Sequence, residues 1–581
     1  MSALAAILAE RGFNVTGSDP RDGAVMDQLR RRGVRVFRQQ DANTVDAICS
    51  GTSMAPLVVT STAVPKSNPE LQQAVRMGLQ VVHRSDLLAA LINAQPSIAV
   101  AGSHGKTTTS SLVATLLQAT HQDPTAVIGG IVPAFGSNGR VGKGRLLVAE
   151  ADESDGSLVK FHPQLAILTN LELDHTDHYP NLEALVATLQ RFAAGAGQLL
   201  ANRDCPVLRD QFKADHWWSI TSPEAVAFAA IPRREQGDGT LADWYENGQL
   251  IGQIELPLPG RHNLSNAAAA IAACRLESVG FADLSQAIAS LQTPCRRFDY
   301  RGNWHGRQVV DDYAHHPSEV AATLAMARLM VTSGRSPLPL VPLRLLAVFQ
   351  PHRYSRTAEF LAAFAAALSA ADAVLLAPLY AAGEAPIAGI DSQALAAAIR
   401  DLDGQLNVEV CDSLDALAEQ LARSSKPGDL VLAMGAGDVN YLWPRLQALP
   451  TANSLIKNNN SGENNSPISN NSPISNNSFI SNNSLEECKS LGENKSHMKH
   501  QSGDHKNNAV NGNNAVNGNN AADELSPADE LSPAHGNSPA HGNSPADGSS
   551  HRGEDSHRGE NSHRGENSQG NENSCGEAAA A

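Results

Sequence analysis

The segment 102–109, GSHGKTTT, has the residue types of a loop that holds a triphosphate. It follows an apolar run (98–101) typical of a buried strand, and it leads into a helical pattern (106–120). At such a turn the backbone N–H groups and the positive end of the helix dipole face bound phosphates. We expect Lys106 to reach the β- and γ-phosphates and the Thr107 hydroxyl to hold a magnesium ion. The two glycines are closer together than in the usual phosphate loop, so a glycine-rich turn that binds nothing remains an alternative.

Two further apolar runs end in groups that bind cations. RLLVAEADESDGS (145–157) places Glu150 just past a predicted strand, and QLAILTNLELDHTDHY (164–179) does the same for His175. In an open parallel sheet, ligands bind beyond the carboxyl ends of the strands, so these groups would meet the phosphate loop in one pocket. Each has a simpler interpretation, a helix cap for the acid and a surface residue for the histidine. Together they indicate two divalent cations between ATP and an oxyanion.

Composition and charge exclude several classes of protein. A chain of 581 residues can hold three or more domains. The net charge of −16, with no window of clustered Lys/Arg and interleaved aromatics, argues against nucleic-acid binding. The seven cysteines include no C-x-x-C pair, which indicates a reducing compartment and no zinc site, so we expect a cytoplasmic protein. We also expect a monomer or a weak homodimer. The apolar stretch 361–380 contains Asp372, which favours a helix and then a buried strand over a membrane span.

The chain divides by composition into four parts. Strand patterns such as NVTGSD, RVFR, LVVTSTAV and QVVHR alternate with helices in the first region (1–95). The same alternation of strand and helix patterns continues in the central region (96–300) and the third region (301–450). We expect an α/β fold of three consecutive domains with mainly parallel, helix-covered sheets. Residues 451–581 consist of six-residue repeats almost without aromatics, which predicts a disordered tail rather than a hexapeptide β-helix.

Seven motifs occur in the order found in the Mur ligases: GSHGKTTT, EADESDGS, TNLELDHTDHY, PLPGRHNLSNAAAA, CRRFD, DDYAHHPSEV and FQPHRYSRT. The resemblance covers residues 1 to about 450 and implies a Rossmann-like first domain, a P-loop ATPase-like central domain and a Rossmann-like third domain. Within the family, the motifs are most similar to those of enzymes that join L-alanine to UDP-N-acetylmuramate. The resemblance therefore implies that ATP phosphorylates the lactyl carboxylate of the sugar and that the L-alanine amine then attacks the acyl phosphate.

The resemblance also implies a role for each matching residue. The nucleotide would be bound by the phosphate loop and by polar residues of later motifs, namely Gly102, Ser103, His104, Gly105, Lys106, Thr107, Thr108, His262, Asn263, Asn266, Arg297, Asp312 and His315. Two Mg²⁺ ions would be held by Thr107, Glu150 and His175. The carboxylate of L-alanine would be clamped by Arg353 and Arg356, next to His352, as a guanidinium fork allows. Solvated arginines that cap a helix are the alternative for that pair. The catalytic set is thus Lys106, Glu150, His175, Arg353 and Arg356.

The amino terminus departs from the family pattern. Family members have a strand and a glycine loop before a Met-Ser pair, and this sequence starts at that pair. A late start-site assignment and a true truncation are both open. In either case we expect weak UDP-sugar binding by the chain as printed, with Asp19, Ser61, His83 and Arg84 as its remaining contacts.

Three alternatives differ from the L-alanine reaction. A recycling ligase would join UDP-N-acetylmuramate to a tripeptide, although the ESDGS and RRFD segments are more similar to those of the L-alanine enzymes. Folylpolyglutamate synthases share the phosphate loop but not DDYAHHP. A truncated, poorly active product of a decaying gene would bind nucleotide or nothing. Against this alternative, the ATP-site residues are intact: Lys106, Thr107, Glu150 and His175.

Overall fold

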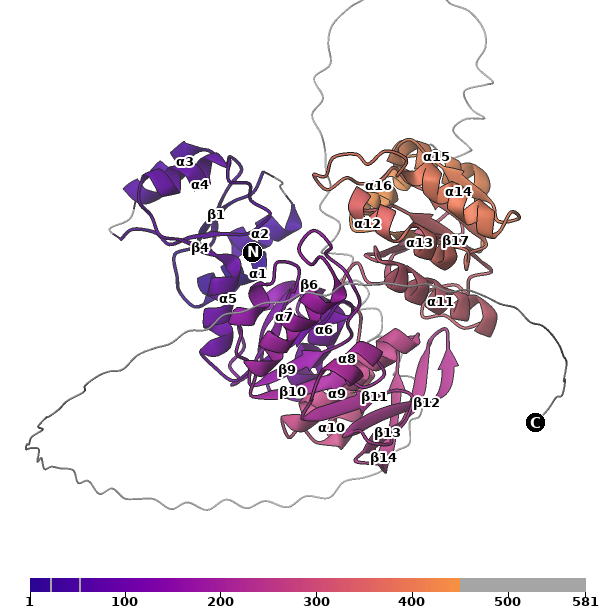
Figure 1. Cartoon of the computed structure of the whole chain (residues 1–581), viewed down its shortest axis with the longest axis horizontal. Helices are drawn as coiled ribbons and strands as arrows, with labels where there is room; N and C mark the ends of the chain where they lie inside the picture. Colours follow the sequence, from indigo (N-terminus) through magenta and orange to yellow (C-terminus); the bar gives the residue numbers. More distant parts are fainter. Residues whose placement is uncertain (21–22, 52–53, 450–581) are drawn as a thin grey trace, which may run out of the picture. The chain divides into compact units, whose positions relative to one another are not determined.

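The computed structural model describes residues 1–20, 23–51 and 54–449 (Figure 1). The predicted tail, 451–581, lies outside the described residues. In the first region, short strands alternate with helices: α1 (Ser2–Glu10), β1 (Thr16–Ser18), α2 (Ala24–Arg31), β2 (Arg35–Phe37), α3 (Ala42–Ser50), β3 (Val58–Thr60), α4 (Pro69–Arg76), β4 (Val81–His83) and α5 (Arg84–Asn93). The strands form two separate parallel pairs, β1 with β2 and β3 with β4. Asn68 illustrates why helices start where they do, because its side chain accepts from two N–H groups of α4 and Pro69 follows it.

The central region is built on one ten-stranded sheet, ordered β14-β13-β12-β11-β10-β9-β5-β8-β6-β7. Its strands are β5 (Ser97–Ala101), β6 (Thr125–Val132), β7 (Ser137–Arg140), β8 (Leu147–Glu150), β9 (Leu165–Leu168), β10 (Gln198–Asn202), β11 (His216–Ser219), β12 (Phe228–Gln236), β13 (Gly239–Glu246) and β14 (Gln249–Leu256). Its helices are α6 (Lys106–Ala119), η1 (Ser157–Lys160), α7 (Leu182–Ala194), α8 (Pro206–Gln211), α9 (Arg261–Leu276) and α10 (Phe281–Ile288). Strands β6, β8, β5, β9, β10, β11 and β12 are parallel, so their carboxyl ends share one edge.

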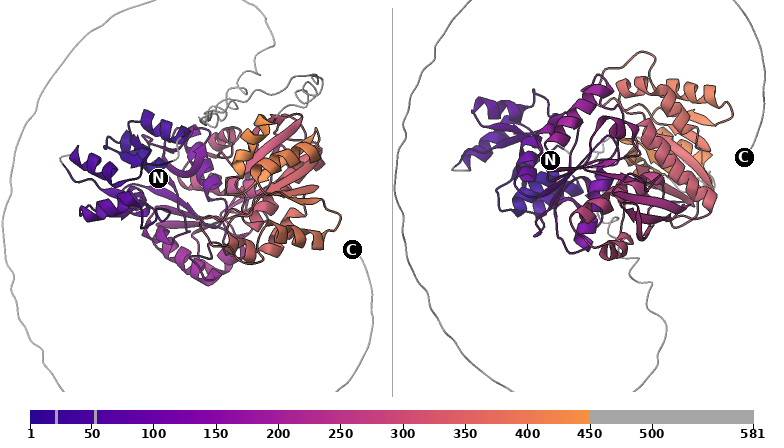
Figure 2. Two further views of the ribbon diagram at one scale, coloured as in Figure 1. Left: turned by 90° about the horizontal axis from the view of Figure 1, so that it is seen from above. Right: turned by 60° about the horizontal axis from the view of Figure 1, so that its bottom comes forward.

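The two faces of the central sheet are covered by different helices. Along β5, Ile98 and Val100 pack into the core that contains α6 and α9, whereas the alternate residues pack on the other face. That second core contains α7 and also buried residues of the first region, including Ile7 of α1 and Ile92 of α5. Figure 2 shows the central strands between these helices. The sheet is therefore a fixed platform, and its carboxyl edge carries the phosphate loop.

The third region has its own six-stranded sheet, ordered β15-β16-β20-β17-β18-β19, in which only the β15–β16 pair is antiparallel. Its elements are β15 (Asp299–Trp304), β16 (Arg307–Asp312), α11 (Pro317–Ser333), β17 (Arg344–Phe349), α12 (Tyr354–Glu359), α13 (Leu361–Leu368), β18 (Ala373–Leu376), α14 (Ser392–Leu402), β19 (Val408–Val410), α15 (Leu414–Ser424), β20 (Asp429–Met434), η2 (Val439–Tyr441) and α16 (Leu442–Ala448). Helices α11, α13 and α14 cover one face, and α15 and α16 cover the other.

The structure confirms the predicted α/β class and the interpretation of the apolar stretch 361–380. That stretch forms the packed helix α13 followed by the fully buried strand β18. Among the described residues, no helix combines the length and the apolar character needed to cross a membrane.

Candidate active site

The phosphate loop joins β5 to α6, and its two glycines have left-handed backbone that other residues adopt with strain. Gly102 has φ +125°, and a Cβ there would lie 2.8 Å from the carbonyl oxygen of Asn170. Gly105 has φ +81°, and a Cβ there would lie 2.5 Å from Oδ1 of Asn266. Asn266 comes from α9 and also accepts from the Thr109 hydroxyl at 3.2 Å. The loop is therefore pressed closely against the segment after β9 and against α9.

Lys106, the first residue of α6, is saturated with acceptors from the chain itself. Its ammonium donates to Oε1 of Glu153 at 2.8 Å. It also donates to two carbonyl oxygens of the loop, those of Gly102 (2.7 Å) and Ser103 (2.9 Å). Burial would lower the pKa of Lys106, but the negative charges of Glu153, Asp152 and Glu150 together outweigh it and raise the pKa. Lys106 is thus a largely enclosed cation, with 13% of its side chain exposed.

Oxygen donors gather beside Lys106 at the end of β8. The Thr107 hydroxyl donates to Oε1 of Glu150 at 2.8 Å, and the N–H of Gly129 donates to Oε2 at 2.7 Å. Burial raises the pKa of Glu150, against the opposing charge of Lys106. A hydroxyl and a carboxylate this close together are the donors that Mg²⁺ prefers.

His175 lies near the same group through Glu153. Its Nε2 is 3.5 Å from Oε1 of Glu153, which is 1% exposed. Burial would lower the pKa of His175, but Glu153 and Asp174 raise it. The second oxygen of Glu153, Oε2, is buried and has no hydrogen-bond partner within the described chain. An unsatisfied carboxylate oxygen beside an imidazole fits a second cation at this position.

The residues expected at the nucleotide lie on α9 and on the segments around β16. Asn263 donates to the carbonyl of Pro259 at 2.8 Å, which fixes the start of α9. Burial lowers the pKa of His262 to about 4, and the charge of Arg297 lowers it further. Both carboxylate oxygens of Asp312 accept backbone N–H groups, from residues 298 and 314, at 2.7 and 2.8 Å. Asp312 therefore fixes the backbone after β16, and burial raises its pKa to about 6.

A network of imidazoles and carboxylates links the phosphate loop to the third region. Nδ1 of His104 lies 3.3 Å from Oε1 of Glu319, and its Nε2 lies 3.5 Å from Oε2 of Glu172. His315 and Arg297 also contact Glu319, at 3.1 and 3.6 Å. The glutamates of this network were not singled out in the sequence, where only their place inside the motifs TNLEL and HHPSE could have indicated them.

The two arginines predicted to clamp an amino acid already face carboxylates. Arg353 donates to Asp177 at 2.7 Å and lies 3.0 Å from Glu384. Arg356, which is 5% exposed, donates to Asp174. His352 lies beside Arg356, at 3.3 Å between ring and guanidinium nitrogens. Both guanidinium groups are thus paired with carboxylates of the chain itself.

The four residues expected at the UDP-sugar lie on different segments of the first region. His83 and Arg84, at the β4–α5 junction, contact the acidic segment after Glu150: Nε2 of His83 is 3.7 Å from Asp155, and Arg84 donates to Asp152 at 2.9 Å. Asp19 and Ser61 directly follow β1 and β3. The structure therefore connects His83 and Arg84 to the segment that also carries Glu153.

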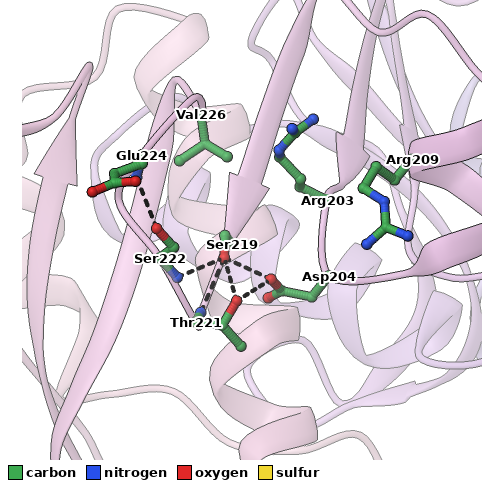
Figure 3. Close-up of a pocket in the computed structure, with 8 residues that line it drawn as sticks. All are labelled: Arg203, Asp204, Arg209, Ser219, Thr221, Ser222, Glu224 and Val226. Carbon is green, nitrogen blue, oxygen red and sulfur yellow. Dashed lines mark hydrogen bonds between the residues drawn. The ribbon is translucent and has the colours of Figure 1, made fainter.

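A separate pocket of about 340 Å³ lies beyond the carboxyl ends of β10 and β11 (Figure 3). Asp204 organises it by accepting from the N–H of Ile220 at 2.7 Å and from the Ser219 hydroxyl at 2.6 Å. The side chains of Arg203 and Arg209 also line it, as Figure 3 shows. None of the residues predicted from the sequence lines this pocket.

Comparison with known proteins places the whole described chain in one family. Three family models match consecutive segments: "Mur ligase family, catalytic domain" at residues 1–96, "Mur ligase middle domain" at 100–274 and "Mur ligase, glutamate ligase domain" at 296–437. A UDP-N-acetylmuramate–L-alanine ligase of Prochlorococcus marinus (strain MIT 9313) is 63% identical over 452 residues, covering 78% of this chain and 93% of the relative. The enzyme of the same name from Synechococcus sp. (strain RCC307) is 61% identical, covering 77% and 93%.

Two solved structures share the fold. The UDP-N-acetylmuramate-alanine ligase of Thermotoga maritima matches with a TM-score of 0.64 at 24% identity, covering 77% of this chain and 95% of that one. A murein peptide ligase of Psychrobacter arcticus matches with a TM-score of 0.58 at 22% identity, covering 78% and 97%. By its family matches and its close relatives, the chain belongs to the Mur ligase family.

Proposed function

We infer that the chain is an ATP-dependent ligase that joins L-alanine to the lactyl carboxylate of UDP-N-acetylmuramate, a step in the synthesis of peptidoglycan precursors. The observation that carries this conclusion is the 63% identity to an enzyme of that name over 93% of its length. The convergence of Lys106, Thr107 and Glu150 at one sheet edge supports it, because phosphoryl transfer depends on positioning and on charge neutralisation. We place the reaction in the cytoplasm, and we propose that the enzyme is a monomer or a weak homodimer.

In the proposed mechanism, the loop and Lys106 hold the triphosphate, with the N-terminus of α6 directed at it. Magnesium ions held by Thr107, Glu150 and His175 would supply further positive charge to the phosphates. Two anions, the sugar carboxylate and the γ-phosphate, can then approach each other, and the carboxylate oxygen attacks phosphorus to give an acyl phosphate and ADP. The L-alanine amine attacks the acyl carbon, and phosphate leaves.

We further propose that Arg353 and Arg356 orient L-alanine through its carboxylate. Both guanidinium groups already bind carboxylates in this structure, those of Asp177 and Asp174. A planar guanidinium matches a carboxylate with two parallel hydrogen bonds. The roles of His262, Asn263 and Asn266 at the base, and of Arg297 at phosphate, remain part of the same proposal.

The tripeptide-recycling reaction is the competing assignment. Curated relatives that are 45–63% identical to this chain carry the name of the L-alanine ligase. These relatives favour L-alanine as the amino-acid substrate.

The test is phosphate release from ATP with UDP-N-acetylmuramate and either L-alanine or the tripeptide. We expect release with L-alanine that Lys106→Ala abolishes and that the exposed Lys143→Ala leaves unchanged. Phosphate release with the tripeptide but not with L-alanine would assign the recycling reaction instead. Equal turnover of Lys106→Ala and the parent would refute the role of the loop.

A further inference from the structure

Three side chains from three separate segments meet beside the phosphate loop. They are His104 in the loop, Glu172 after β9 and His316 at the start of α11, and one ligand atom of each lies within 4.8 Å of the other two. Nε2 of His104 is 3.5 Å from Oε2 of Glu172, and Nδ1 of His316 is 3.6 Å from the same oxygen. Four ligands at about 2.0–2.1 Å around a tetrahedral ion are roughly 3.3–3.4 Å apart. Two separations in the cluster are close to that value.

The imidazoles of the cluster have unused nitrogen atoms. Nε2 of His104 and Nε2 of His316 are both buried without a hydrogen-bond partner in the described part of the chain, whereas Nδ1 of His316, the nitrogen nearer Glu172, accepts from the Ser318 N–H at 3.4 Å. His316 as a whole is only 4% exposed. Buried polar atoms normally have partners, because leaving one unsatisfied is costly. A buried imidazole nitrogen without a partner, next to a carboxylate, is therefore an indication of a missing ligand.

A carboxylate also stands behind one of the imidazoles. Oε1 of Glu319 lies 3.3 Å from Nδ1 of His104, on the side of the ring away from Glu172. Histidines that bind metals commonly donate their other N–H to a carboxylate in this way, which fixes the tautomer and orients the ring. Glu319 would thus direct Nε2 of His104 into the cluster.

We propose that His104, Glu172 and His316 bind one divalent transition-metal ion of the zinc class, at a site distinct from the Mg²⁺ positions at Thr107 and Glu150. Imidazole nitrogen suits Zn²⁺, whereas Mg²⁺ prefers oxygen, so the two kinds of site select different ions. The Glu172 side chain is 43% exposed, which leaves a fourth position open to water. A proton competes with the metal ion for His104. Burial would lower the pKa of His104, but Glu172 and Glu319 raise it to about 9.

Such an ion would join the phosphate loop to α11 of the third region. Glu172 already touches both, because its carbonyl accepts from Ser103 at 2.8 Å and its carboxylate accepts from the Ser318 hydroxyl. Ligation would add a third, stronger link between the same segments. We therefore expect zinc to raise the melting temperature and to slow turnover even in excess Mg²⁺.

The experiment measures Zn²⁺ binding to the full chain by competition with a chromophoric chelator in excess Mg²⁺. We expect Glu172→Gln and His316→Gln each to lose one tight equivalent that the parent binds. The exposed His305→Gln should lose none. Histidines of residues 451–581 are present in every variant, so their contribution cancels. Glu319→Gln should weaken the site about 10- to 100-fold, as loss of a carboxylate behind a ligating imidazole does.

A second measurement needs no substitution. Co²⁺ replaces Zn²⁺, and four-coordinate Co²⁺ absorbs visible light far more strongly than six-coordinate Co²⁺. We expect the parent to give the intense four-coordinate spectrum in excess Mg²⁺ and Zn²⁺ to abolish it. Absence of that spectrum, or unchanged Zn²⁺ binding in folded Glu172→Gln and His316→Gln, would overturn the proposal.

Discussion

Glu153 holds the Lys106 ammonium, which we propose binds the triphosphate. The ammonium has three N–H donors, and the chain accepts all three, through Glu153, Gly102 and Ser103. A phosphate that binds Lys106 must displace at least one acceptor, and Glu153 is the charged one. We predict that Glu153→Gln, which keeps the shape but removes the charge, binds ATP more tightly and turns over more slowly.

The magnitude follows from the bond that is exchanged. A hydrogen bond to a charged group contributes about 1.5–3 kcal/mol, and the ammonium stays charged in both proteins, so we assign the bond to the glutamate to the upper end of this range and the bond to the glutamine to its lower end. The difference, about 1–1.5 kcal/mol, corresponds to a Kd for ATP about 5- to 12-fold lower. Turnover should fall about 10- to 100-fold, because His175 loses the carboxylate 3.5 Å from its Nε2.

Calorimetry with a non-hydrolysable ATP analogue at fixed Mg²⁺ gives the Kd, and phosphate release gives kcat. Asp155→Asn is the matched control, since it removes one charge from the same segment but its carboxylate lies near His83 and Arg84. Its Kd for the analogue should change less than that of Glu153→Gln. A folded Glu153→Gln protein with an unchanged or weaker affinity would refute the competition.

Three further predictions test packing and charge. Gly136→Ala introduces only left-handed backbone strain of about 1–2 kcal/mol, whereas Gly102→Ala also places its new Cβ 2.8 Å from a carbonyl oxygen. The urea midpoint of Gly102→Ala should therefore fall further than that of Gly136→Ala, and Gly102→Ala should lose ATP binding. Equal midpoints for the two variants would contradict this. Asp174→Asn leaves the buried Arg356 without its carboxylate and should lower the free energy of unfolding by about 3–5 kcal/mol in denaturant. Adding Arg356→Met should recover part of that loss. Purely additive effects of the two substitutions would show that Asp174 and Arg356 are not coupled. The pKa of His262 in the folded protein is about 4, below its usual 6.5, so its contribution to stability is present above pH 6.5 and is lost as the pH falls toward 4. His262→Gln should therefore make the free energy of unfolding depend less on pH between 6.5 and 4. The same pH dependence in the variant and the parent would argue against this role of His262.

The sequence was sufficient to predict the elements that carry the site. Alternating and continuous apolar runs identified the short strands of the first region and the buried strands β5, β8 and β9, because burial leaves a clear pattern in those residues. The rule that parallel strands end at one edge then placed Lys106, Thr107 and Glu150 together, and Thr107 does contact Glu150. The registers and the ten-stranded extent of the central sheet depend on pairings between distant segments, which local patterns do not specify.

Partners of the charged residues were harder to predict. EADESDGS contains four acids, and nothing in its spacing shows that Glu153 turns inward to Lys106 while Asp155 turns to His83. The pairing of Arg356 with Asp174 joins residues 182 positions apart, so it follows only from the packing of two sheets. The order of the motifs predicted which residues belong to the site, but it did not predict which of these residues form ion pairs or hydrogen bonds with one another.

These pairings bear on how an acidic protein binds anionic substrates. Lys106, Arg353 and Arg356, three cations proposed to bind phosphate or carboxylate, are each held by a carboxylate of the chain. Burying them unpaired would be costly, so the carboxylates stabilise the site before substrate arrives. Substrate binding is then an exchange of one anion for another, and affinity reflects the difference between two charged bonds. Each displaced carboxylate needs a new cation, and Glu153, which lies beside His175 with one oxygen already unsatisfied, is well placed to meet a divalent ion that arrives with the triphosphate.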